Sequence, residues 1–256
     1  MRRVDPTRYP RRSDARSLLQ VGAHLLLVLT PLLLAARLGP GLHLLPLWLW
    51  FGLTMNPLLN LLHEAAHGLV FRQRGADRLL GVYLLAPLSL ADFDRYRDRH
   101  FDHHRHLGQA RDPKYTYRVG IHGPALARLC WRSLTLAEAR QRFRQQTDAP
   151  LPRLTLLRTA LLQGGLLLAL TAAALTPQRS AAQVLWAVAL AYGLVYGYGL
   201  AALTVLLSAL RGIAEHRSYN DSEPLVGVAV LRNLRCGWLE RLVLGAYGFT
   251  EHLSAQ

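Results

Sequence analysis

Cysteine is scarce in this chain of 256 residues, which contains only Cys130 and Cys236. Two cysteines cannot build a disulfide framework or a four-cysteine iron–sulfur site, so any metal must be held by other side chains. Acidic residues are also few, with 16 Asp and Glu against 30 Lys and Arg, which gives a net charge of +14. Histidine, with 11 residues, is the obvious remaining ligand.

Charged residues are almost absent from four long apolar runs, and these runs keep the mean hydropathy at +0.14. Each is long enough to cross a bilayer core of about 30 Å as a helix of about 20 residues. Short turns join the first run to the second and the third to the fourth. The sequence therefore predicts an all-α integral membrane protein with four transmembrane helices arranged as two hairpins. The runs extend approximately from Leu18 to Leu38, from Leu42 to Leu62, from Leu154 to Leu175 and from Ala182 to Leu210.

Arginine is distributed unevenly around these runs. The N-terminal tail, the middle segment 63–153 and the tail 211–256 hold nearly all of it, whereas the two short turns hold only Arg179. The positive-inside rule then places both termini and the middle segment in the cytoplasm. A net positive charge can also mark a nucleic-acid binder, but arginines beside membrane runs indicate orientation instead, so we expect no nucleic-acid partner.

The remaining segments are expected to form one cytoplasmic cap, 63–153 and 211–256, of a single domain 1–256. The apolar stretches Leu79–Ala91 and Leu225–Phe249 are too short or too interrupted by charge to span, which favours interfacial helices. The stretch Glu138–Arg153 has the composition of a solvated helix or loop. The basic N-terminus resembles a signal peptide, but the long run after it predicts a retained first span. Gly193 and Gly197 form G-x-x-x-G, which predicts close helix packing in the fourth run.

Histidines gather where the topology predicts one membrane face. His63, Glu64 and His67 form H-E-A-A-H, whose spacing fits a zinc protease and equally any metal that takes two imidazoles from one helix face. His24 and His43 stand apart from the rest and are interpreted as structural. The other clustered histidines are His100, His103 and His104 at i, i+3 and i+4, then His216 and His252.

Seven imidazoles are too many for one zinc ion, because a catalytic zinc uses about three protein ligands and a water. The third and fourth runs also contain no Asp or Glu that would complete a zinc-protease site. A second metal explains the surplus, and imidazole suits iron, zinc and copper. Glu64 is then expected to orient a ligand imidazole through its other nitrogen.

The histidine motifs resemble the histidine boxes of the membrane fatty acid desaturase superfamily: H-E-A-A-H at 63–67, H-F-D-H-H at 100–104, A-E-H-R at 214–217 and E-H at 251–252. The run H-R-H-L-G-Q-A-R-D-P at 104–113 is also similar to that family. The resemblance covers the chain from the first span to its last residues. It implies four transmembrane helices under a cytoplasmic cap, in agreement with the topology above.

The resemblance further implies an O2-dependent non-haem di-iron centre, with two iron ions, that takes hydrogen from an unactivated methylene of a fatty acyl chain. His106 is a candidate for supporting a ligand, and Asp102 and Asp112 are candidates for supporting a ligand or capping a helix. The metal ligands that the resemblance carries over are His63, His67, His100, His103, His104, His216 and His252.

Two departures from the family pattern leave alternatives open. The third box of the family often reads H-x-x-H-H, whereas Ala255 and Gln256 stand where its paired histidines would fall, and Gly212 stands where some members have asparagine. Either further ligands lie beyond Gln256, the centre is built differently, or the chain is an inactive relative. The same metal centre also serves hydroxylases and ketolases of alkyl or carotenoid substrates, and the zinc protease remains a rival.

No haem-binding H-P-G-G segment and no cysteine cluster accompanies the histidine motifs. The electron donor is therefore expected to be a separate protein of the ferredoxin or cytochrome type, with its reductase. The arginine-rich face is suited to an acidic donor and equally to anionic lipid of the bilayer.

Overall fold

A computed structural model of the chain describes residues 13–107, 109, 111–113, 123–146 and 150–215, and the described residues form helices and no strands. In chain order the elements are α1 (Asp14–Leu38), α2 (Leu44–His67), α3 (Arg74–Leu80), the π-helical segment η2 (Gly81–Leu85), α4 (Ala86–Leu88), α5 (Phe93–Arg105), α6 (Gly123–Leu134), α7 (Ala137–Gln146), α8 (Arg153–Ala174), α9 (Ala181–Ala189), the π-helical segment η4 (Leu190–Thr204) and α10 (Val205–Glu215).

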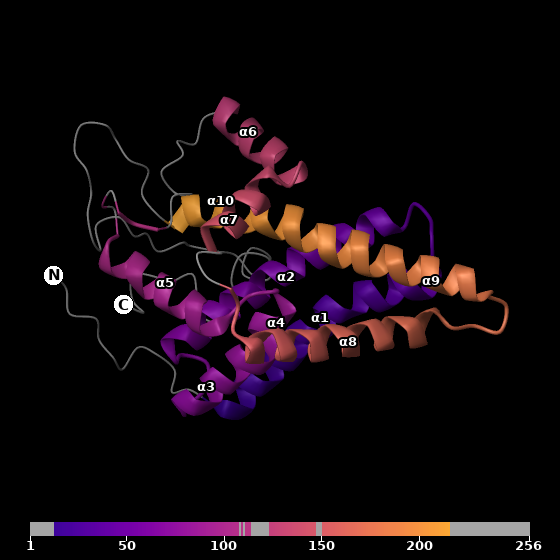
Figure 1. Cartoon of the computed structure of the whole chain (residues 1–256), viewed down its shortest axis with the longest axis horizontal. Helices are drawn as coiled ribbons and strands as arrows, with labels where there is room; N and C mark the ends of the chain where they lie inside the picture. The colour runs from indigo at the N-terminus through magenta and orange to yellow at the C-terminus, as the bar shows by residue number, and fades with distance from the viewer. Residues whose placement is uncertain (1–12, 108, 110, 114–122, 147–149, 216–256) are drawn as a thin grey trace.

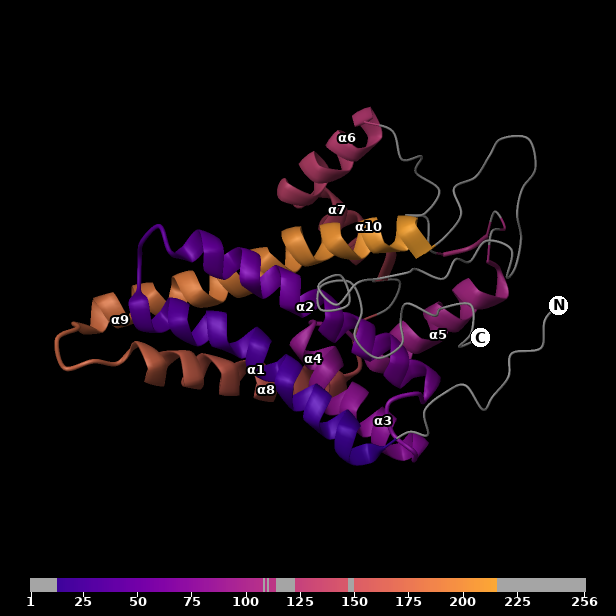
Figure 2. The same ribbon diagram turned by 180° about the vertical axis from the view of Figure 1, so that it is seen from behind.

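Four helices are long and apolar enough to cross a membrane, as the sequence predicts: α1, α2, α8 and the continuous helix Ala181–Ala214 built from α9, η4 and α10. They lie side by side along the long axis of the molecule (Figures 1 and 2), with α1 packed against α2 and α8 and with α2 packed against η4. The second helix is longer than predicted. It continues past Leu62 to His67, so the whole H-E-A-A-H motif is helical.

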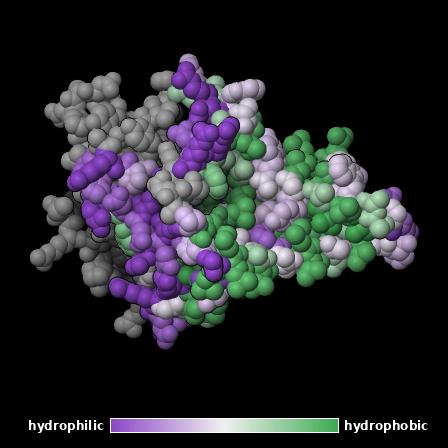
Figure 3. Space-filling view, in the orientation of Figure 1, coloured by the Kyte–Doolittle hydropathy of each residue, from purple (hydrophilic) through white to green (hydrophobic). Residues whose placement is uncertain are grey.

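The two ends of the bundle differ in polarity. Apolar residues cover most of the surface toward the end where α8 and α9 meet, except at its tip, and hydrophilic residues cover the opposite end, which carries α5 (Figure 3). Leucines point outward from α8 along its length, among them Leu157, Leu161 and Leu168. A helix that exposes apolar side chains in this way needs an apolar solvent. The chain is accordingly a membrane protein.

Arg179 fastens the loops at the apolar end. Its guanidinium donates to the carbonyl oxygens of Ala36 and Ala174 at 2.9 and 3.0 Å and to that of Arg37 at 2.8 Å. These carbonyls belong to the last turns of α1 and α8, where no further helical N–H groups are available to them. Ser180 then begins α9 with a capping box that includes Gln183. One arginine therefore ties the end of α1 to the end of α8.

The apolar stretch Leu79–Ala91 does not span the bundle. It forms the end of α3, η2 and α4, whose carbonyl ends are held by a buried polar network from two of the long helices. Gln163 of α8 donates to Pro87 O at 2.9 Å, and Tyr196 of η4 donates to Leu88 O at 2.8 Å. The second expected interfacial stretch, Leu225–Phe249, lies outside the described residues.

The predicted role of the G-x-x-x-G glycines is not what the structure shows. A side-chain carbon at Gly193 meets no described atom within 4 Å, and one at Gly197 meets only a backbone oxygen of its own helix. The close approaches occur instead at Gly199, against Phe51 of α2, and at Gly52, against Leu203 of η4. Motif spacing therefore missed the packing glycines, because π-helical turns in η4 shift which residues face α2.

Candidate metal centre

The H-E-A-A-H motif occupies the last two turns of α2. His63 and His67 lie one above the other on this helix, with ring centroids 4.8 Å apart, and both His63 and Glu64 are buried. The helix ends at Gly68, which adopts the left-handed conformation (φ 68°) typical of a helix C-terminus. Asp77 then holds the following loop, because its carboxylate accepts from the backbone N–H of Val70 at 2.8 Å.

The second group of histidines lies on α5. This helix begins after Asp92, whose side chain caps it by accepting from Arg95 N at 2.9 Å. Arg97 of α5 donates to Ala66 O at the end of α2 (3.3 Å), and the Tyr96 ring stacks on His100 with a centroid distance of 5.8 Å. The Arg97 contact joins α5 to the end of α2, whereas the Tyr96 ring packs on His100 within α5 itself.

Charge pairing also fixes the start of α5. Arg78 of α3 is paired with Asp94 in the first turn of α5 through both of its terminal nitrogens. The hydrogen bond to Asp94, together with the carboxylate's charge, raises the pKa of Arg78 above its ordinary value. Both side chains are more than half exposed, so the pair adds orientation and little stability.

Ring nitrogens from the two helices converge on one point. Nε2 of His100 lies 2.8 Å from Nε2 of His67 and 2.8 Å from Nε2 of His104. A neutral ring nitrogen carries either one proton or one in-plane lone pair, so three such atoms do not form a hydrogen-bonded chain through His100. Two imidazole nitrogens at right angles around one ion lie about 3 Å apart for metal–nitrogen bonds of about 2.0–2.1 Å. The arrangement fits nitrogens directed at a cation.

His63 belongs to the same cluster by a looser distance criterion. One ligand atom from each of His63, His67 and His100 lies within 4.8 Å of the others. The ring centroids of His63 and His100 are 4.2 Å apart, and those of His63 and His104 are 6.3 Å apart. The described residues thus bring four predicted ligands from two chain segments into one cluster.

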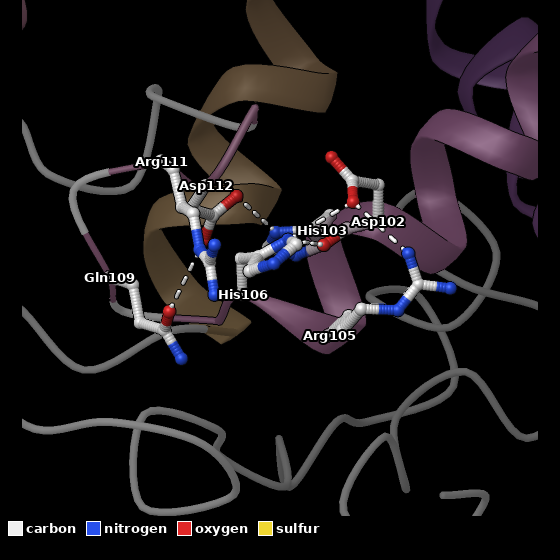
Figure 4. Close-up of polar contacts among 7 residues, drawn as sticks. All are labelled: Asp102, His103, Arg105, His106, Gln109, Arg111 and Asp112. Carbon is white, nitrogen blue, oxygen red and sulfur yellow. Dashed lines mark hydrogen bonds and ion pairs between the residues drawn. The ribbon is translucent and has the colours of Figure 1, made fainter.

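His103 lies at the edge of this cluster and is oriented by a carboxylate. Its Nδ1 is 2.7 Å from Oδ1 of Asp112, and both side chains are almost wholly buried (Figure 4). The carboxylate accepts the Nδ1 proton, which leaves the lone pair on Nε2, the nitrogen on the far side of the ring. The ring centroid of His103 lies 5.6 Å from that of His104. A carboxylate behind an imidazole is the usual outer partner of a metal-binding histidine.

The sequence alone left the role of Asp112 open between supporting a ligand and capping a helix. Two consecutive turns bring it back to α5: Gln109 N donates to His106 O at 2.8 Å, and Asp112 N donates to Gln109 O at 3.2 Å. The signal was present in the R-D-P end of the run at 104–113, but no periodic pattern links a loop residue to a helix face. His106, expected to support a ligand, contacts Asp102 of its own helix, with Nδ1 3.0 Å from the carboxylate (Figure 4).

Comparison with known proteins gives a match to one protein family. The family model described as Fatty acid desaturase matches residues 40–252, which is most of the chain and includes all seven predicted ligands. The chain belongs to the fatty acid desaturase family. No curated protein and no solved structure gives a match.

Membership of the desaturase family makes the chain an oxidoreductase of the desaturase or oxidase type. The histidine cluster is compatible with metal binding and with the di-iron site expected for a desaturase. The same membership removes the support for the zinc-protease interpretation of H-E-A-A-H, which rested on that motif alone.

Two predicted desaturase ligands, His216 and His252, lie outside the described residues. The last described residue is Glu215 of α10, and Figures 1 and 2 show this end of α10 at the same end of the molecule as α5. The sequence predicts a structural role for two other histidines, and each of them forms a hydrogen bond with a backbone carbonyl of its own segment. His24 Nδ1 lies 3.0 Å from Gln20 O, and His43 Nε2 lies 2.9 Å from Gly39 O.

Proposed function

We propose that this chain is an O2-dependent di-iron desaturase that introduces a double bond into a fatty acyl chain within the membrane. The observation that carries the proposal is the convergence of the Nε2 atoms of His67, His100 and His104 from two helices. The iron ions, when bound, supply the activation of O2. The overall change is –CH2–CH2– + O2 + 2e⁻ + 2H⁺ → –CH=CH– + 2H2O, so two of the four electrons that reduce O2 come from the substrate and two from a donor.

The protein's own residues hold and orient the metal ligands in this proposal. His63 and His67 come from α2, His100, His103 and His104 from α5, and His216 and His252 complete the set of seven. Asp112 keeps the Nδ1 proton on His103, and Glu64 supports a ligand imidazole through the outer nitrogen of that ring.

The proposed topology follows from the arginines and the four long helices. The helices form two hairpins, both termini and the histidine cluster lie on the cytoplasmic side, and the fatty acyl substrate enters from the bilayer. The two electrons come from a separate donor of the ferredoxin or cytochrome type with its reductase.

His104→Ala provides the first test. Because His104 Nε2 is one of the converging atoms, its removal is expected to lower bound iron and to reduce desaturation by more than the roughly 100-fold seen when residues that only support ligands are lost. His43→Gln is the matched control. It removes an imidazole at the opposite end of α2 while keeping a donor for Gly39 O, and it should retain both iron and turnover.

The measurement is metal content per chain together with lipid product analysis, on protein in nanodiscs supplied with O2 and a reduced donor. Two irons per chain and a new double bond support the proposal. Full activity in His104→Ala, or one zinc per chain with activity abolished only by Glu64→Gln, would overturn it. A hydroxylated or ketone product would keep the metal centre and replace desaturation by oxygen insertion.

A further inference from the structure

An exposed apolar surface runs along α6, the turn at Leu136 and α7. Trp131 is 69% exposed and Phe143 66% exposed, although the stretch from Glu138 was expected to be solvated. The opposite side of α6 is packed, since Leu129 contacts Ala209 and Ile213 of α10. The exposed apolar side chains on this surface are Leu126, Trp131, Leu134, Leu136 and Phe143. Exposed aromatic side chains gathered in this way mark an interaction surface.

A hydrogen bond fixes the depth of this surface along the bundle. The Tyr198 hydroxyl of η4 donates to Leu134 O at 2.9 Å, so the end of α6 lies beside the fourth long helix. Two residues earlier, Tyr196 lies level with Gln163 of α8, which donates to its hydroxyl at 2.6 Å. Arg158 lies five residues before Gln163 in α8, which places it about 7 Å nearer the polar end of the bundle. Arginines near the ends of spans lie at the level of the headgroups.

The α6–α7 turn is therefore level with, or deeper than, Arg158 near the polar end of α8. Figures 1 and 2 show α6 standing off the side of the bundle beside α10, and not beyond its polar end. In Figure 3 the hydrophilic side chains of this region border directly on the apolar belt. The end of α6 lies directly beside the fourth long helix, and this position next to a membrane span favours lipid over a partner protein as the occupant of the surface.

The charges of the surface match anionic lipid. Arg128, Arg140 and Arg144 are exposed beside the apolar side chains. Glu138 lies 3.4 Å from Arg132 and 3.6 Å from Arg142, so its carboxylate is paired with these two arginines. Basic residues beside an anionic membrane surface contribute about 1 kcal/mol each to binding.

We infer that α6 and α7 lie in the bilayer interface, with Trp131, Leu136 and Phe143 inserted among the acyl chains and the exposed arginines against anionic headgroups. The inference rests on the membrane-spanning topology of the proposed function and is independent of its iron chemistry. On this inference α7, in the stretch that the sequence predicts to be solvated, contacts the membrane in addition to the four long helices.

Nitroxide accessibility in nanodiscs tests this placement. Labels are attached at Trp131→Cys or Phe143→Cys in a chain carrying Cys130→Ser and Cys236→Ser, in nanodiscs of phosphatidylcholine with phosphatidylglycerol. Leu168→Cys on the outer face of α8 is the apolar reference, and Arg105→Cys, whose native side chain is 70% exposed at the end of α5, is the aqueous reference. Both test labels are expected to be more accessible to O2 than to a charged nickel chelate, as at 168.

Accessibility at 131 and 143 that matches position 105 would overturn the inference, whether or not a donor protein later protects these labels. In nanodiscs of phosphatidylcholine without phosphatidylglycerol, the accessibility of both labels to the nickel chelate is expected to rise several-fold relative to O2. In the triple variant Arg128→Gln, Arg140→Gln, Arg144→Gln, accessibility should no longer depend on lipid charge. A wild-type label insensitive to lipid charge would overturn the assignment to anionic headgroups. An aqueous reading at 168 would overturn the topology and the inference together, whereas lost turnover with unchanged labels would count against the proposed function alone.

Discussion

The carboxylate of Asp112 contacts Nδ1 of His103 at the candidate metal centre, 2.7 Å away. Asp112→Ala is expected to weaken iron retention or activity by about 10- to 100-fold, because the imidazole loses the group that fixes its proton and its orientation. Asp112→Asn keeps an acceptor oxygen without the charge and should fall between Ala and wild type. Iron remaining after a timed challenge with a chelator measures the effect.

Asp102→Asn is the control for this substitution. Asp102 also contacts a histidine, His106, but its side chain is 43% exposed and it pairs with Arg105 at the surface of α5. Its loss should leave iron retention within about twofold of wild type, as expected for an exposed pair of small energetic weight. Equal losses of iron in the Asp102 and Asp112 variants would remove the special role of the buried carboxylate.

The candidate ligands and their carboxylate partner differ in how far the sequence predicts them. His63 and His67, and His100 and His104, are four residues apart on helices, so their shared faces follow from helical geometry alone. Asp112 reaches His103 through two turns after α5 ends, and the path of those turns depends on local hydrogen bonds that no periodic pattern encodes. The sequence thus predicts helix-borne ligands and leaves their loop-borne support undecided.

The last turns of α2 carry His63 and His67, and the helix ends at Gly68, which adopts the left-handed conformation with φ 68°. Gly68→Ala is expected to destabilise the protein by about 1 kcal/mol, because a side chain is strained in this conformation and the new carbon would lie 3.2 Å from the Arg74 side chain. Gly68→Asn should cost less, since asparagine tolerates the left-handed region. Thermal unfolding in one detergent, read with iron content, ranks the three proteins.

A lower melting temperature for the asparagine variant than for the alanine variant would contradict this account. A control at Gly75 of α3, where a side-chain carbon meets no described atom within 4 Å, should be neutral or slightly stabilising as alanine.

Arg179 tests how the ends of the long helices are held together. Its guanidinium serves carbonyls of both α1 and α8, and lysine cannot present several donors in the same fixed plane. Arg179→Lys is expected to lower the stability of the bundle by about 1 kcal/mol, and Arg179→Gln by somewhat more. The histidine cluster lies at the other end of the bundle, so iron per folded chain should not change. Loss of iron without loss of thermal stability would contradict a purely structural role.

At the scale of the whole molecule, the sequence predicts the number and position of the long helices well, because a run of about 20 consecutive apolar residues seldom forms anything but a membrane-spanning helix. Packing between them was predicted less well. The G-x-x-x-G spacing pointed to Gly193 and Gly197, whereas Gly52 and Gly199 allow α2 and η4 to approach. Interhelical fit depends on the local helical turn and on partner side chains from distant segments, and neither is visible in a run of apolar letters.

The net charge of +14 predicts that the proposed electron donor is attracted to the protein by electrostatic forces. With an acidic ferredoxin as donor, the second-order rate of donor oxidation is expected to fall about tenfold as salt rises from about 0.02 to 0.3 M, because screening shortens the reach of the basic face to below about 10 Å. Neutral-lipid nanodiscs keep anionic lipid from screening the arginines. An uncharged small reductant serves as the control and should show a nearly constant rate. If the ferredoxin rate is equally constant, long-range attraction does not guide the donor, and the arginines act on lipid and orientation alone.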